Sequence, residues 1–128
     1  MNLCIDTHSH TIASGHAYST IREMAKAAAE KELSALAITE HAPAMPETCG
    51  NFYFSNLKVI PRTMYGVNLL FGVELNILDE EGNIDLPPSL LKSVDIAIKK
   101  MVNTSSLYLS IIDIDPKMSA QHAARSPS

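Results

Sequence analysis

The residues of this chain best suited to chemistry are its histidines, four of which lie in the first third of the sequence. These four are His8, His10, His16 and His41, and each stands at or just after the polar end of an apolar segment. Neutral imidazole is a common ligand for zinc, manganese and iron. Imidazoles that converge on one point therefore predict a metal site, and hydrolysis is the chemistry such a site supports.

The segment Asp6-Thr7-His8-Ser9-His10 alternates acid or imidazole with small hydroxyl residues. In an extended chain, residues two apart share a face and lie roughly 6.5 to 7 Å apart. Asp6, His8 and His10 are thus expected to point the same way, with both imidazoles on one ion. A single histidine at a strand end is more often a capping or surface residue, and for His16 alone both interpretations stay open.

Two later segments end in further candidate ligands. The apolar run Ala35–Ile38 leads to His41, and the run 67–73 is closed by Glu74. Parallel strands bring their carboxyl ends to one edge of a sheet, so both residues should face the first histidine pair. A carboxylate such as Glu74 can bridge two metal ions roughly 3.5 to 4 Å apart; the alternative is a solvated loop residue.

The hydrophobic pattern predicts strands that alternate with helices. A capping box of Thr20 and Glu23 indicates a helix over about 21–32. Strands are expected at 2–6, 35–38, 67–73 and 94–98, a long loop at 42–55, a turn at 79–83, a short helix through Leu91 and a further candidate strand at 107–112. Residues 119–128 are small and polar, and we expect them to be disordered.

Length and composition limit the class of protein. The 128 residues, 46% hydrophobic and 19% charged, predict one globular domain. A net charge of −4 supplies no positive field for nucleic acid, and the apolar runs are too short to span a membrane. Cys4 and Cys49 form no CxxC motif; we expect free thiols, with Cys4 buried, in a reducing cytoplasm.

Several motifs in order resemble the amino-terminal half of the PHP (polymerase and histidinol phosphatase) family, in its small bacterial phosphatase branch. They are Asp6–His10, Ser14–Thr20, Ile38–Pro43, Gly72–Ile77 and Gly82–Asp85. The resemblance covers residues 2–98. It implies an α/β fold, a distorted β/α barrel of which this chain is a partial, truncated form, since a complete barrel of the usual kind needs roughly 250 residues.

The resemblance also implies a ligand set. His8 and His10 would bind one metal with Glu74, His16 and His41 a second, and Glu74 would bridge to a third. The ions would be divalent, zinc foremost, with manganese or iron as alternatives. Asp6 and Glu40 would not bind the ions themselves but would hold the ligand histidines in place. Arg62 would contact the substrate phosphate, or would be a surface arginine. The nucleophile would be water rather than a side chain.

We expect residues 99–128 to be unrelated to the family, because the ligand histidine that the family places after the strand near 98 is missing from Lys99–Asn103. The expected function is therefore a metal-dependent phosphoesterase for a small phosphorylated substrate, impaired by truncation. The alternative is an inactive metal-binding or vestigial interaction module, because five candidate ligands fill one tetrahedral site but not three. An amidohydrolase-like enzyme fits the remaining motifs less well. An opened barrel would also expose a strand edge and favour self-association.

Overall fold

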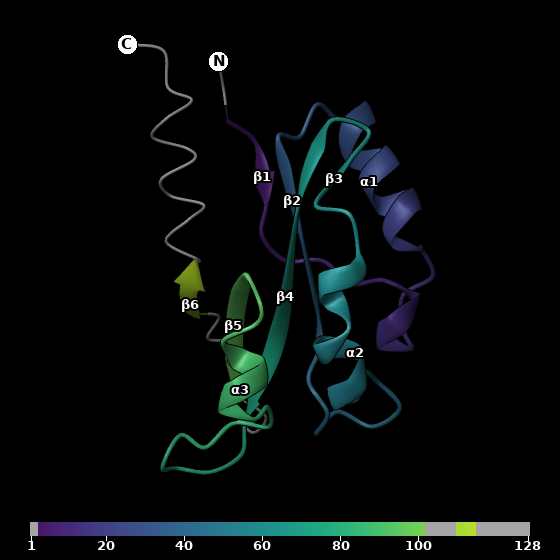
Figure 1. Ribbon diagram of the computed structural model, residues 1–128. Helices are drawn as coiled ribbons and strands as arrows, with labels where there is room; N and C mark the ends of the chain where they lie inside the picture. Colours follow the sequence, from purple (N-terminus) through teal and green to yellow (C-terminus); the bar gives the residue numbers. More distant parts are fainter. Residues whose placement is uncertain (1–2, 102–109, 115–128) are drawn as a thin grey trace.

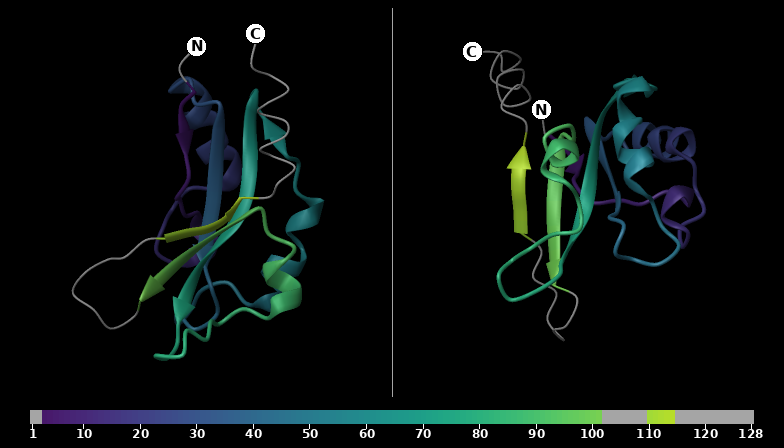
Figure 2. Two further views of the ribbon diagram at one scale, coloured as in Figure 1. Left: turned by 90° about the vertical axis from the view of Figure 1, so that its left-hand side faces the viewer. Right: turned by 60° about the horizontal axis from the view of Figure 1, so that its bottom comes forward.

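The computed structural model describes residues 3–101 and 110–114 (Figure 1). The strands form one sheet, which helices cover on one side (Figure 2). The elements in chain order are β1 (Ile5–Asp6), η1 (Ile12–Ser14), α1 (Ile21–Glu30), β2 (Ala35–His41), α2 (Asn51–Ser55), η2 (Leu57–Val59), β3 (Thr63–Met64), β4 (Val67–Ile77), α3 (Pro88–Leu91), β5 (Ile96–Met101) and β6 (Ser110–Ile114). This is the predicted α/β half-barrel.

The sheet is parallel along its central strands. Its order is β1-β2-β4-β5-β6, with β3 paired to β4 outside this path. The β1/β2, β2/β4 and β4/β5 pairs are parallel, whereas β3 and β6 run antiparallel to their neighbours. The β2/β4 register places His41 directly beside Glu74. Two candidate ligands from different strands therefore lie at the same edge, as the sequence predicts.

Helix α1 begins where its capping box predicts. Thr20 accepts a hydrogen bond from the backbone of Glu23, whose side chain accepts one from the backbone of Thr20. The helix ends at Glu30, two residues earlier than the expected 32, and Glu32 adopts a left-handed φ of 59° without a glycine. Ala25 and Ala28 are buried against the sheet. The small alanine side chains allow α1 to pack closely on the apolar face of β2 and β4.

The two faces of β4 differ in chemistry because successive side chains of a strand alternate. Leu69, Phe71, Val73 and Leu75 belong to the main core, together with buried residues of α1. The opposite face carries Gly72 and then Glu74. A Cβ atom added to Gly72 would lie 2.4 Å from the backbone oxygen of Ile96, so only glycine fits between β2 and β5 here. This close packing brings three strands together just before Glu74.

Several predicted boundaries differ from the observed ones. Strand β2 continues past the expected residue 38 to His41, because its polar end pairs residue by residue with β4. Strand β1 covers only residues 5–6 of the expected 2–6, and Cys4, which precedes it, is free but exposed rather than buried. Cys49 is free and buried. The expected loop 42–55 contains α2, a short helix that begins after Gly50.

The outer edge of β5 carries another strand. Residues 96–99 of β5 pair with β6, so the edge that the sequence predicts as free is paired over this stretch. Of the candidate strand 107–112, residues 110–112 belong to β6, while 107–109 and the expected disordered tail 119–128 lie outside the described residues. Among the described residues, no helix has the length and apolar character to cross a membrane.

Candidate metal centre

Hydrogen bonds to backbone carbonyl groups hold the segment that follows β1 along the carboxyl half of β2. The Ser9 hydroxyl donates to the carbonyl of Ala37 at 2.6 Å, and the amide of Thr39 donates to the carbonyl of Ser9 at 2.8 Å. The carboxylate of Asp6 accepts from the amide of His8 at 3.0 Å. Asp6 thus supports the backbone at His8 rather than its imidazole, and the fixed alternation places His8 on the face opposite to Ser9.

Glu40 fixes the next part of this segment from within the protein. Its side chain is 0% exposed and accepts two hydrogen bonds from Thr11, from the amide at 2.6 Å and from the hydroxyl at 2.8 Å. Burial raises the pKa of Glu40, and the bonds from Thr11 act against this rise. One oxygen of Glu40 also lies 3.9 Å from Nδ1 of His10. Glu40 therefore supports the His10 segment directly.

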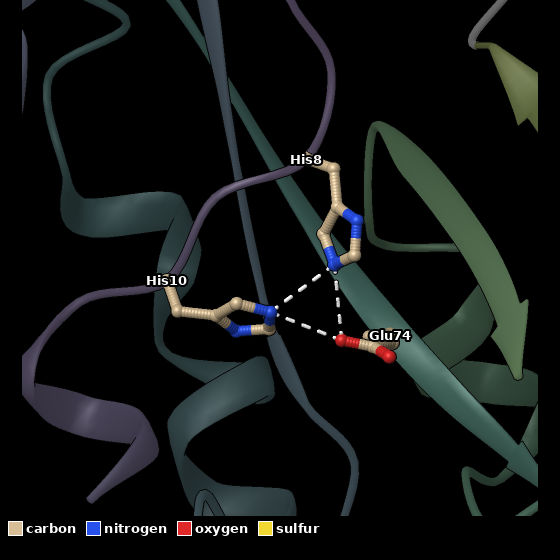
Figure 3. Close-up of side chains that lie close together, drawn as sticks. All are labelled: His8, His10 and Glu74. Atoms are coloured by element: carbon tan, nitrogen blue, oxygen red, sulfur yellow. Dashed lines mark hydrogen bonds and ion pairs between the residues drawn. The ribbon is translucent and has the colours of Figure 1, made fainter. Parts of the chain in front are cut away.

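Three ligand-type atoms converge at the carboxyl edge of the sheet (Figure 3). Nε2 of His8 and Nε2 of His10 each lie 3.0 Å from Oε2 of Glu74, and the two nitrogens are 3.1 Å apart. Two ligands of a tetrahedral zinc ion, each about 2.0 to 2.1 Å from it, lie roughly 3.3 Å from one another. The residues present therefore fit a metal ion with little movement.

His41 adds a fourth donor beside this group. Its Nδ1 atom lies 3.3 Å from Oε2 of Glu74, yet it is buried without a hydrogen-bond partner. Burial lowers the pKa of His41 to about 4, although the negative charge of Glu74 acts in the opposite direction. The ring stacks on that of His10, with centroids 4.3 Å apart. A neutral imidazole with an unpaired ring nitrogen at this place suits metal binding.

The carboxylate of Glu74 is the negative centre of the site. Its side chain is 2% exposed, and burial alone would raise its pKa. Hydrogen bonds from His10 and His8, together with electrostatic interactions with His41 and His8, outweigh burial and lower the pKa to about 2. Glu74 is therefore ionised at neutral pH. A buried negative charge surrounded by imidazoles is an arrangement that a divalent cation stabilises.

His16 lies at the outer side of this group. Its ring centroid is 4.6 Å from that of His41 and 5.9 Å from that of His10. The preceding turn needs Gly15, which has a φ of 80° and approaches the backbone of Glu47 so closely that a Cβ would lie 2.7 Å from its oxygen. All five predicted ligands thus come together from three segments of the chain.

Arg62 does not join this group. Its guanidinium forms an ion pair with Asp95 and lies 5.3 Å from the ring centre of Phe71, on the core side of β4. Two residues near the ligands escaped the sequence analysis. Ser14 places its hydroxyl 3.2 Å from Nδ1 of His10 and accepts from the amide of His41. Lys100 reaches Glu74 because of the β4/β5 register, for which the sequence carries no local signal.

The chain is similar in sequence to known proteins along most of its length. A sequence profile described as the PHP domain matches residues 6–120. The chain belongs to the PHP domain family. A probable phosphatase of Thermoanaerobacter sp. strain X514 is 54% identical over 101 residues, which are 79% of this chain and 41% of that protein. A probable phosphatase of Acetivibrio thermocellus is 43% identical over 122 residues, 95% of this chain and 47% of that protein.

A third relative of this PHP chain is a probable phosphatase of Aliivibrio fischeri, 50% identical over 98 residues, which are 77% of this chain and 40% of that protein. The chain spans less than half the length of each of these relatives. The resemblance that the sequence motifs indicate is confirmed. The family match runs past residue 98, and the division of the chain into 1–98 and 99–128 stays a prediction.

Proposed function

We propose that this PHP chain is a metal-dependent phosphoesterase that acts on a small phosphorylated substrate in the cytoplasm. The observation that carries the proposal is the convergence of His8, His10 and Glu74 within 3.1 Å of one another. The three relatives described above are named probable phosphatases, which supports the same class of reaction.

Each residue of the site would have its own role in binding the metal ion. Glu74 supplies the negative charge, and His8 and His10 supply nitrogen ligands on the open side of the site, where their side chains are 31% and 20% exposed. When bound, a divalent ion lowers the pKa of a water molecule and polarises a phosphoryl oxygen. A mixed nitrogen and oxygen ligand set favours zinc, with manganese or iron as alternatives.

A second candidate is a catalytically inactive module that binds metal. The observation in its favour is the number of ligands, because the described residues bring together four imidazoles and one carboxylate. This set completes one tetrahedral site and leaves little for further ions. With a single ion, no second ion would hold the leaving oxygen of the phosphate ester, so we further propose that turnover is low.

The test is metal-dependent hydrolysis of p-nitrophenyl phosphate. The chain is stripped with a chelator and reloaded with zinc or manganese, and turnover is compared between the wild type and His8→Ala. We expect reloading to restore turnover and His8→Ala to lower it at least about 100-fold, because a ligand is lost. His122→Ala is the matched control, since the sequence around His122 matches no motif of the site.

The two candidates give different results in this assay. Unchanged turnover in His8→Ala would show that this site takes no part in hydrolysis. Stoichiometric zinc binding by the wild type without any turnover would favour the inactive module. Zinc binding is measured by elemental analysis of the same dialysed samples, so that both outcomes come from one preparation.

A further inference from the structure

The two oxygens of the Glu74 carboxylate have different neighbours. Oε2 lies 3.0 Å from Nε2 of His8 and 3.0 Å from Nε2 of His10. Oε1 lies 3.8 Å from the ammonium nitrogen of Lys100. One oxygen thus faces metal ligands, and the other already faces a cation that belongs to the chain itself.

The strand register explains why Lys100 reaches this place. In the parallel β4/β5 pair, Glu74 lies beside Ile98 and Asn76 lies beside Lys100. Residues two apart in a strand share a face, so Lys100 is on the face of β5 that adjoins Glu74. Its side chain is 33% exposed, which leaves the ammonium group partly hydrated while it contacts a carboxylate that is 2% exposed.

We propose that the ammonium group of Lys100 occupies the cation position at Oε1, and that the centre therefore holds a single divalent ion, at Oε2. This inference rests on the proposed metal centre. A carboxylate that bridges two ions uses one oxygen for each. An ion on Oε1 would be forced close to the ammonium group, and like charges at such a short distance repel one another even where water partly screens them.

The charges of the site agree with one ion. The ionised Glu74 contributes one negative charge, and Lys100 balances it before any metal is present. A single divalent ion then finds two imidazoles and a carboxylate oxygen in place. A second ion would add two positive charges near Lys100 with no further carboxylate among the described residues contacting Lys100 or Glu74 to offset them.

The experiment measures zinc stoichiometry by elemental analysis and zinc affinity by competition with a chromogenic chelator. We expect one ion per chain in the wild type. Lys100→Met removes the charge but keeps roughly the length of the side chain. It should lower the Kd of the first ion about tenfold and allow a second ion to bind at Oε1, because the repulsive charge is lost. Lys100→Glu replaces the cation with a ligand and should bind two ions.

Lys99→Met is the matched control. Lys99 lies on the same strand, beside Leu75, and therefore on the opposite face. The same loss of charge there should leave both stoichiometry and Kd unchanged. Circular dichroism of each variant shows that it is folded before metal is added.

The outcomes separate this inference from the proposed function. Two or more ions per wild-type chain would overturn the role of Lys100 and leave the metal centre intact. An equal effect of Lys99→Met and Lys100→Met, or no effect of either, would also overturn it. No zinc binding by the wild type or by Lys100→Met would contradict the metal centre itself, and with it the proposed function.

Discussion

The four clustered histidines form two pairs that the structure treats differently. His8 and His10 follow β1 and each place Nε2 3.0 Å from the same oxygen of Glu74. His41 ends β2 with a buried, unpaired Nδ1 atom, and His16 contacts the cluster through its ring. The first pair is partly exposed and already arranged as ligands, whereas the second pair packs behind and beside it.

This difference indicates that the fold assigns metal binding and structural support to different histidines. An extended segment alternates its side chains, so two histidines two residues apart reach one point without any other element. His41 depends on the register between β2 and β4, which sets its place beside Glu74. The first pair is therefore expected to control metal affinity, and His41 to link the site to the stability of the sheet.

The largest effect is expected at Glu74, which both pairs share. Glu74→Gln keeps the shape of the side chain but removes its charge, so zinc affinity should fall at least about 100-fold. Competition with a chromogenic chelator measures the change. Asp79→Asn, an acid-to-amide change on the exposed turn after β4, is the control. Equal zinc affinity in wild type and Glu74→Gln would place the metal elsewhere.

The second prediction concerns pH and the metal-free chain. The pKa of His41 is about 4 in the folded chain, compared with an ordinary value of 6.5. Between these two pH values His41 is mostly protonated in the unfolded state and mostly neutral in the folded state. Stability is therefore complete above pH 6.5 and is lost as the pH falls. The free energy of unfolding should drop by roughly 2 to 3 kcal/mol between pH 6.5 and 4.5, measured by urea denaturation.

A variant isolates the contribution of His41 to this loss. His41→Phe keeps a ring that can stack on His10 but cannot titrate, so the pH dependence over this range should flatten. The pKa of Glu74 is lowered to about 2, and its contribution to stability is lost mainly below its ordinary value of 4.5. A slope that persists unchanged in His41→Phe would assign the effect to another group.

Much of this division could be predicted from the sequence, for physical reasons that are local. The period of two in Asp6–His10 and the capping box of Thr20 and Glu23 depend only on neighbouring residues, and the structure contains both features. The meeting of His41 and Glu74 followed from a general property of parallel sheets. Burial of an apolar run such as 35–38 was equally evident from its composition.

The remainder depends on partners far away in the sequence. Residues 39–41 are polar and resemble a loop, yet pairing with β4 keeps them in the strand. The partner of Glu40 is Thr11, 29 residues away, and no local pattern indicates this. Lys100 lies past the predicted end of its strand, so its approach to Glu74 needed the register of β4 and β5.

A smaller effect is expected at Thr11, whose contact with Glu40 holds the segment that carries His8 and His10. Thr11→Val removes the hydroxyl that donates to the buried Glu40 and accepts from the amide of Ala13. Leaving a buried carboxylate oxygen without its partner should cost about 2 kcal/mol of unfolding free energy. Urea denaturation measures the loss, with Thr63→Val on the exposed end of β3 as control. A loss no larger than in this control would show that Glu40 does not depend on Thr11.

The smallest effect is expected at His16, and it tests the division most sharply. The His16 ring lies beside His41 and makes no contact with Glu74 within the described part of the chain. His16→Ala should therefore weaken zinc binding less than tenfold, whereas His10→Ala should weaken it at least about 100-fold. Both variants remove one imidazole from the same cluster, so overall charge and composition cannot explain a difference. Equal losses would mean that His16 also binds the ion, and that the two pairs act as one ligand set.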